Sequence, residues 1–208
     1  MHSNPMKKRY GLLALSAATA FLLSASAWAE GDPARGRARA QMCEGCHGIA
    51  DYRTAYPQVY SVPKIGGQEA PYIVKTLQDY KTGARKHPTM RGIAATLSDQ
   101  DTADLAAHYA GNARLGTTTA VASDDLGKKK ADEACAACHG PEGNKPITPD
   151  TPRLAGQEYG YLVQALTDYR KGTRDNGVMS AMAKPLTEKE IRDLAGYFSR
   201  QQGLTTKR

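Results

Sequence analysis

Large aromatic side chains are scarce in this chain of 208 residues, which contains 1 Trp and 2 Phe. Trp28 and Phe21 both lie close to the N terminus, so most of the chain has to build its interior from Ala, Leu, Ile, Val and Tyr. Small domains made from small side chains have thin cores, and they often depend on an additional stabilising group. We therefore expect a large apolar group that the polypeptide itself does not supply.

Long apolar runs are also missing after the N-terminal segment, which argues against a membrane span in the body of the chain. The one extended run, residues 11–23, is shorter than the roughly 20 residues that cross a bilayer. It follows three cations at 7–9 and precedes Ala-Trp-Ala at 27–29, as in a secretory signal. We predict that residues 1–29 are a cleaved signal peptide and that the mature protein is soluble and exported to the periplasm. The alternative is an uncleaved membrane anchor.

A strong excess of either charge is absent as well. The chain has 28 Lys and Arg against 21 Asp and Glu, and without the three cations of the signal peptide 25 remain against the same 21. The net charge of the mature chain is therefore only +4. Because nucleic-acid binding usually requires a clustered and strongly basic surface, the composition argues against nucleic acid as a partner.

The sequence is internally duplicated. Residues 62–83, VPKIGGQEAPYIVKTLQDYKTG, match residues 151–172, TPRLAGQEYGYLVQALTDYRKG, at an offset of 89. The same offset relates Met90 to Met179. A repeat of this length indicates two copies of one small domain. We predict domain 1 at residues 30–112, a linker at 113–122 and domain 2 at 123–208.

Each copy is predicted to be helical, with long loops and without strands. Asp32 is a suitable N-cap for a first helix that has Pro at its first position, and Asp124 matches it in the second copy. A second helix is expected over residues 70–82 and 159–171, because apolar and aromatic residues recur on one stripe. The last helix is expected to follow a capping box in each copy, formed by Ser98 with Asp101 and by Thr187 with Glu190.

The four cysteines of the chain form two short motifs. QMCEGCHG contains Cys43, Cys46 and His47, and EACAACHG, 92 residues later, contains Cys135, Cys138 and His139. A disulfide would be a poor structural bridge at this spacing, a redox-active dithiol lacks its usual strand and helix context, and zinc would need both pairs to converge. Covalent haem attachment explains every element, because the cysteines form thioethers to the vinyl groups and the histidine lies beneath the iron. We predict two covalently bound haem c groups, which also supply the missing apolar material.

These motifs, the VPKIGGQ and TPRLAGQ segments, the methionines that precede TLSDQ and PLTEK, and the tandem duplication resemble the dihaem cytochromes c of the cytochrome c4 type. Each half is similar to a class I cytochrome c. The resemblance covers essentially the whole chain after residue 29 and is weak in the linker. It implies an all-α fold of two tandem domains, each a few helices and loops wrapped around one covalent haem.

The second axial ligand of each iron distinguishes electron transfer from catalysis. A thioether gives a stable electron carrier at raised potential, whereas a vacant position allows chemistry. With His47 and His139 as the proximal ligands, we predict Met90 and Met179 as the opposite ligands, because they occupy equivalent positions in the two copies.

Three other side chains are weaker candidates for the same positions. Met182 could replace the predicted methionine of the second copy, although its counterpart Ile93 is expected in the core. His87 could give bis-histidine ligation, although its counterpart is Asn176. His108 lies in the last helix of its copy and is expected at a helix surface or an interface.

The resemblance also implies an acceptor for the second ring nitrogen of each proximal histidine. In class I cytochromes c this acceptor is the backbone carbonyl of a loop proline, and Pro63 and Pro152 match that position. The loop after the first motif is three residues longer than its counterpart and contains Tyr52, Tyr56 and Tyr60. These tyrosines either shield the first haem or make it electronically distinct, or the segment is a simple surface loop.

With both irons ligated by side chains, the chain has no evident place to activate a substrate, and the cofactor carries the chemistry. We predict a carrier without enzymatic activity, which shuttles single electrons from a respiratory donor, such as a membrane-bound complex, to an acceptor such as a terminal oxidase. The expected partners are redox proteins, not a small-molecule substrate, and a loose contact with the membrane surface fits this role. Docking would use cations around the haem edges, with Lys64, Lys81, Lys86 and Lys171 as candidates.

Two alternative functions stay open. A peroxidase-like dihaem enzyme would keep one iron open and would lack one of the two methionines, whereas both copies have theirs. A redox subunit of a dehydrogenase complex would expose a large apolar patch when isolated.

Overall fold

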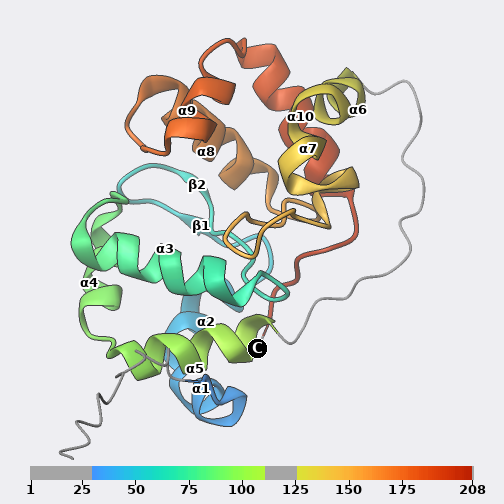
Figure 1. Ribbon diagram of the computed structural model, residues 1–208. Coiled ribbons are helices and arrows are strands. Elements are labelled where there is room, and N and C mark those ends of the chain that lie inside the picture. Colours follow the sequence, from blue (N-terminus) through green and yellow to red (C-terminus); the bar gives the residue numbers. More distant parts are fainter. Residues whose placement is uncertain (1–29, 111–125, 208) are drawn as a thin grey trace, which may run out of the picture.

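The computed structural model describes residues 30–110 and 126–207, and the fold is all-α (Figure 1). The predicted signal peptide 1–29, the linker 113–122 and the predicted cap at Asp124 lie outside the described residues. The first copy of the repeat, coloured blue to green, and the second, yellow to red, form two halves that lie against each other. Within the described residues, no helix is long and apolar enough to cross a membrane.

The helices of the first half follow the predicted order. Asp32 caps the first of them by accepting a hydrogen bond from the backbone N–H of Ala34, and Pro33 occupies its first turn. Ser98 and Asp101 exchange hydrogen bonds ahead of the last helix, as the capping box predicts. In chain order the helices are α1 (Pro33–Arg39), α2 (Gln41–His47), α3 (Ala70–Thr82), α4 (Pro88–Ala95) and α5 (Asp99–Ala110).

The second half repeats this arrangement. A capping box between Thr187 and Glu190 starts its last helix, as predicted. The segment with the second cysteine motif is one continuous helical stretch, in which a turn of π-helix joins two short α-helices. In chain order the elements are α6 (Leu126–Lys130), the π turn (Ala131–Cys135), α7 (Ala136–His139), a 3-10 turn (Pro141–Gly143), α8 (Tyr159–Lys171), α9 (Gly177–Ala183) and α10 (Glu188–Arg200).

Helices α3 and α8 have the bounds that the sequence predicts, whereas the sequence pattern does not predict α4 and α9. The two unpredicted helices have only 8 and 7 residues, which is too short to show a clear helical period. Their N-caps are His87 and Asn176, whose side chains each accept a hydrogen bond from the backbone N–H of a methionine three residues later.

Each half has its own small core. Leu105 on α5 and Leu194 on α10 are equivalent residues in the repeat, and they are 2% and 1% exposed. Cys43 packs against the first cluster and Cys135 against the second, so each cysteine motif is anchored to the core of its own half. Apart from Tyr109, the buried members of the first cluster are all aliphatic: Ala40, Ile73, Leu97, Leu105 and Ala106.

The longer loop of the first half folds into a short hairpin, which corrects the expectation that strands are absent. β1 (Arg53–Thr54) pairs antiparallel with β2 (Tyr60–Ser61). Figure 1 shows the hairpin between α3 and α8, and β2 contacts α8. A Cβ at Gly160, in the first turn of α8, would lie 2.9 Å from Ser61 Oγ, so glycine permits the close approach. The loop therefore takes part in the contact between the halves.

Two glutamines join the halves by reciprocal hydrogen bonds. The side chain of Gln157 accepts from the backbone N–H of Lys64 at 2.8 Å and donates to the carbonyl of Lys64 at 2.9 Å. Its repeat equivalent, Gln68, pairs in the same way with Arg153, at 2.8 and 3.1 Å. Both glutamines are buried. Each half thus presents the same residue to the same backbone position of the other, and the interface has approximate twofold symmetry.

Ion pairs flank this glutamine contact. Lys64 Nζ lies 3.3 Å from Glu158 Oε1 and donates to the carbonyl of Gly156 at 2.9 Å. The equivalent Arg153 donates from Nε to Glu69 Oε1 at 2.8 Å. Lys64 is therefore part of the contact between the halves, which corrects the expectation that it is a docking residue.

The C-terminal tail crosses from the second half back to the first (Figure 1). Thr205 and Gly66 exchange backbone hydrogen bonds at 2.8 and 3.1 Å, and Leu204 beside them is 4% exposed. Lys207 Nζ donates to the carbonyl of His108. His108 thus lies at an interface, which is one of the two locations expected for it.

Candidate functional site

Both cysteine motifs open onto one cavity between the halves. Its volume is about 1310 Å³, which exceeds the roughly 300–1,000 Å³ of a site for one small molecule. The wall includes both motifs in full, with Cys43, Cys46, His47, Cys135, Cys138 and His139. Because equivalent residues line it from both sides, the cavity is a pair of sites joined across the interface.

The environment of the cysteines argues against the disulfide, dithiol and zinc alternatives. All four cysteines are free thiols in the structure. Burial raises the pKa of Cys43, and it raises the pKa of Cys135 to about 11, whereas a redox-active dithiol needs a lowered pKa on its attacking cysteine. Within residues 30–110 and 126–207, no three or more His, Cys, Asp or Glu side chains are grouped to hold a metal ion.

The two motif histidines are held in the form that a metal ligand requires. His47 Nδ1 lies 2.7 Å from the carbonyl oxygen of Pro63, and His139 Nδ1 lies 2.8 Å from that of Pro152. A carbonyl can only accept, so Nδ1 carries the proton in each ring. Burial lowers the pKa of both histidines and so favours the neutral ring. The lone pair of Nε2 is then available to a metal.

Met90 on α4 and Met179 on α9 line the same cavity and are half-buried. The backbone N–H of Met90 donates to His87 Nδ1 at 3.2 Å, and that of Met179 donates to Asn176 Oδ1 at 3.0 Å. His87 thus has the same capping role as its counterpart, which explains the residue without bis-histidine ligation. Met182 also lines the cavity, but it is 41% exposed, which favours Met179 as the candidate ligand.

Two half-buried arginines meet between the halves. Arg85 donates to the hydroxyl of Tyr161 at 2.6 Å, and Arg174, its repeat equivalent, donates to the hydroxyl of Tyr72 at 3.3 Å. Both guanidinium groups also lie over tyrosine rings, 4.7 and 4.5 Å from the centroids of Tyr80 and Tyr169. Within the described part of the chain, the side chains of both arginines contact tyrosines and neither forms an ion pair, so their positive charge is not matched by a carboxylate.

This positive charge matches the chemistry of haem, which carries two carboxylates on an otherwise apolar ring. Burial raises the pKa of Tyr161, but the attraction of Arg85 and Arg174 outweighs it and lowers that pKa below its usual range, so the environment favours an anion. Guanidinium groups hold carboxylates through paired hydrogen bonds. The apolar walls, neutral imidazoles, cysteine pairs and arginines together fit two haem c groups.

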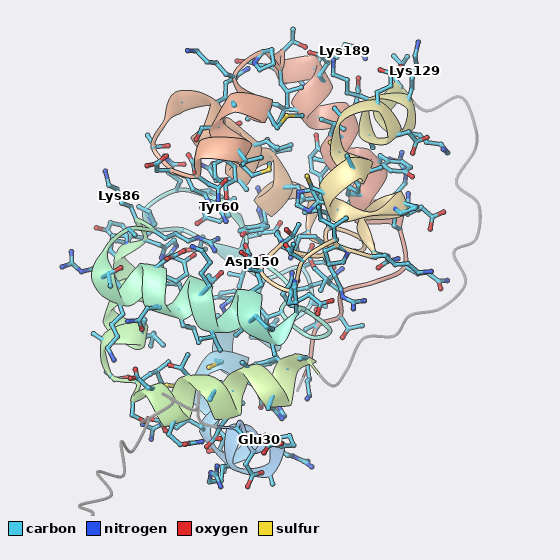
Figure 2. The ribbon with its side chains drawn as sticks, viewed as in Figure 1. Glu30, Tyr60, Lys86, Lys129, Asp150 and Lys189 are labelled. Atoms are coloured by element: carbon cyan, nitrogen blue, oxygen red, sulfur yellow. The ribbon has the colours of Figure 1, made fainter. Side chains whose placement is uncertain are left out.

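The sequence interpretation overlooked this arginine cluster. The signal for it was present, because Arg85 and Arg174, like Tyr72 and Tyr161, stand 89 residues apart in the repeat. Tyr60, on the hairpin of the first half, lies between the halves in Figure 2. Its ring is edge-on to that of His87, with the two centroids 6.4 Å apart.

Comparison with known proteins gives matches over both halves. A family model described as cytochrome c matches residues 125–201. Cytochrome c4 of Pseudomonas aeruginosa is 37% identical, with 88% of this chain and 93% of that protein covered. The thiosulfate dehydrogenase electron acceptor of Stutzerimonas stutzeri is 33% identical, with 77% and 79% covered. The crystal structure of reduced recombinant cytochrome c4 from Pseudomonas stutzeri has a TM-score of 0.68 at 30% identity, with 82% of this chain and 99% of that chain covered.

Proposed function

We propose, from the premise that this chain belongs to the cytochrome c4 family, that it is a periplasmic shuttle for single electrons. The chain is a dihaem electron-transfer protein, and its two CXXCH motifs bind haem c. The proposed donor is a respiratory complex in the membrane, and the proposed acceptor is a redox protein such as a terminal oxidase. Export by residues 1–29 and the division into domains 30–112 and 123–208 belong to the same proposal.

The observation that carries the proposal is that each half places a motif histidine and a methionine at equivalent positions on the wall of the cavity. We assign His47 and Met90 to the first iron, and His139 and Met179 to the second. The support for the histidines is their fixed tautomer, and the support for the methionines is their equivalent position on α4 and α9. The carbonyls of Pro63 and Pro152 would keep the imidazole rings oriented.

When bound, each haem takes up and releases one electron. Burial keeps the imidazoles neutral. His47 and Met90 would hold one iron and His139 and Met179 the other, which would leave no position at either metal for a substrate. Lys86 and Lys171 are exposed on the rim of the cavity and remain the candidate docking cations. Lys86 lies at the outer edge of the first half in Figure 2.

A second candidate function is that of electron acceptor for a dehydrogenase. The 33% identity to a thiosulfate dehydrogenase electron acceptor favours it. The two roles differ in the donor and share the same haem chemistry. Reduction of the purified protein by thiosulfate and a thiosulfate dehydrogenase, at a rate that saturates with protein concentration, would favour the second role.

Carbon monoxide binding tests the shuttle against the dihaem enzyme. In the reduced, haem-loaded protein both irons are expected to be closed, so carbon monoxide should leave the absorption spectrum unchanged, and oxidation should remove two electrons per chain. Met90→Ala should then bind carbon monoxide at one haem. Met42→Ala is the matched control, because Met42 is 46% exposed beside the first motif and should have no effect. Binding at one haem of the unaltered protein would favour a catalytic function.

A further inference from the structure

The two halves differ at one buried aromatic position beside the haem cavity. Tyr109 on α5 and Phe198 on α10 are equivalent in the repeat, and they are 2% and 4% exposed. The carbonyl of Tyr109 accepts from the N–H of Gly67 at 2.8 Å, and the carbonyl of Phe198 accepts from the N–H of Gly156 at 2.8 Å. Both side chains line the cavity. Because the backbone setting is the same, the phenolic hydroxyl is the difference between the two sites.

The hydroxyl of Tyr109 is buried beside the Cys43 thiol, with which it interacts, but it makes no well-aligned hydrogen bond within the described part of the chain. Burial raises the pKa of Tyr109, and the neighbouring Cys43 thiol raises it further, so the hydroxyl keeps its proton. A buried O–H group is unfavourable unless it has an acceptor. A buried hydroxyl next to Cys43 that lacks a well-aligned acceptor therefore indicates that the acceptor forms when the haem is attached to this cysteine.

We propose that the Tyr109 O–H group donates to the thioether sulfur that Cys43 forms with its haem, and that this hydrogen bond raises the reduction potential of that haem. The proposal rests on haem attachment at Cys43 and Cys46. Sulfur is a weak acceptor, and hydrogen bonds around a haem are one means by which a protein sets its potential. No equivalent donor is present at Phe198.

The direction of the effect follows from charge. Reduction adds one electron to the haem, no bond is broken, and Tyr109 keeps its proton. The hydrogen end of the O–H dipole faces the haem, so it stabilises the reduced state relative to the oxidised state. Lys207 acts in the same sense, because its Nζ lies 5.8 Å from the centroid of the Tyr109 ring.

The test is the pair of midpoint potentials of the haem-loaded protein, measured by spectroelectrochemistry. Tyr109→Phe should fold, because Phe occupies the equivalent position in the other half. It should lower the potential of the first haem and leave the second unchanged. The reciprocal change Phe198→Tyr is expected to raise the potential of the second haem.

The two haems are told apart in a Met179→His background, where histidine in place of methionine should lower the potential of the second haem. Tyr109→Phe should then move the higher wave alone. An unchanged potential of the first haem, or equal shifts of both haems, would overturn the proposal. If Met179→His moves neither wave, the assignment of Met179 as a ligand is wrong. Tyr109→Phe in the unaltered protein then decides the role of Tyr109: a shift of one wave supports the proposal, and a shift of both waves or of neither overturns it.

Discussion

The reciprocal glutamines make the contact between the halves sensitive to a single amide group. Gln157→Met keeps the length of the side chain and removes its donor and acceptor, so the backbone N–H and carbonyl of Lys64 lose partners at 2.8 and 2.9 Å. The N–H of Glu158 loses a third hydrogen bond, at 2.9 Å. A buried polar group left without a partner costs about 1–3 kcal/mol. The two groups across the interface therefore give an expected loss of about 2–6 kcal/mol in the free energy of unfolding.

The assay is a urea titration of the haem-loaded protein, followed by far-ultraviolet circular dichroism and haem absorbance. Gln68→Met should cost a similar amount, and the double variant should cost less than the sum, because both changes break one interface. Gln78→Met, on the exposed face of α3, is the matched control and should stay within about 0.5 kcal/mol of the parent. If Gln157→Met behaves like this control, the amide pairs do not hold the halves together and the reasoning is wrong.

Two further changes test the cap of α4 and the C-terminal tail. Burial lowers the pKa of His87, so its contribution to stability is complete above the unfolded value of about 6.5 and is lost as the pH falls from there through the folded pKa. His87→Asn should keep the cap, as Asn176 does in the other half, and should lose less free energy of unfolding on acidification than the parent. Urea titrations at neutral and acidic pH measure this loss, and an equal loss in the parent and the variant would contradict the prediction. Leu204→Ala should cost about 2–5 kcal/mol in the same titration, because the side chain is 4% exposed, whereas Leu126→Ala, at a residue 63% exposed, should change little.

The sequence predicts those parts of the molecule that depend on local pattern or on the repeat. The bounds of α3 and α8 follow from their apolar stripe, and the starts of α5 and α10 follow from their capping boxes. The hydrogen bonds to Pro63 and Pro152 are present where the resemblance to class I cytochromes c places them. The haem-binding pairs are visible because their spacing is short and occurs twice.

Contacts between the halves are the part that sequence reasoning did not reach. Lys64 has the appearance of a solvated cation, yet it pairs with Glu158 because two segments roughly ninety residues apart meet in space. Nothing local indicates that the chain after α10 returns to Gly66, since a backbone bridge of this kind leaves no side-chain pattern. Gln68 and Gln157 stand 89 residues apart in the matching segments, but their role depends on how the two copies face each other.

An electron shuttle requires that Met90 and Met179 close both irons. This ligation is measured by the near-infrared charge-transfer band between methionine sulfur and ferric haem, integrated against total haem in the oxidised protein. Two methionine equivalents for two haems are expected. One equivalent or none would contradict this ligation and would indicate an open or bis-histidine iron.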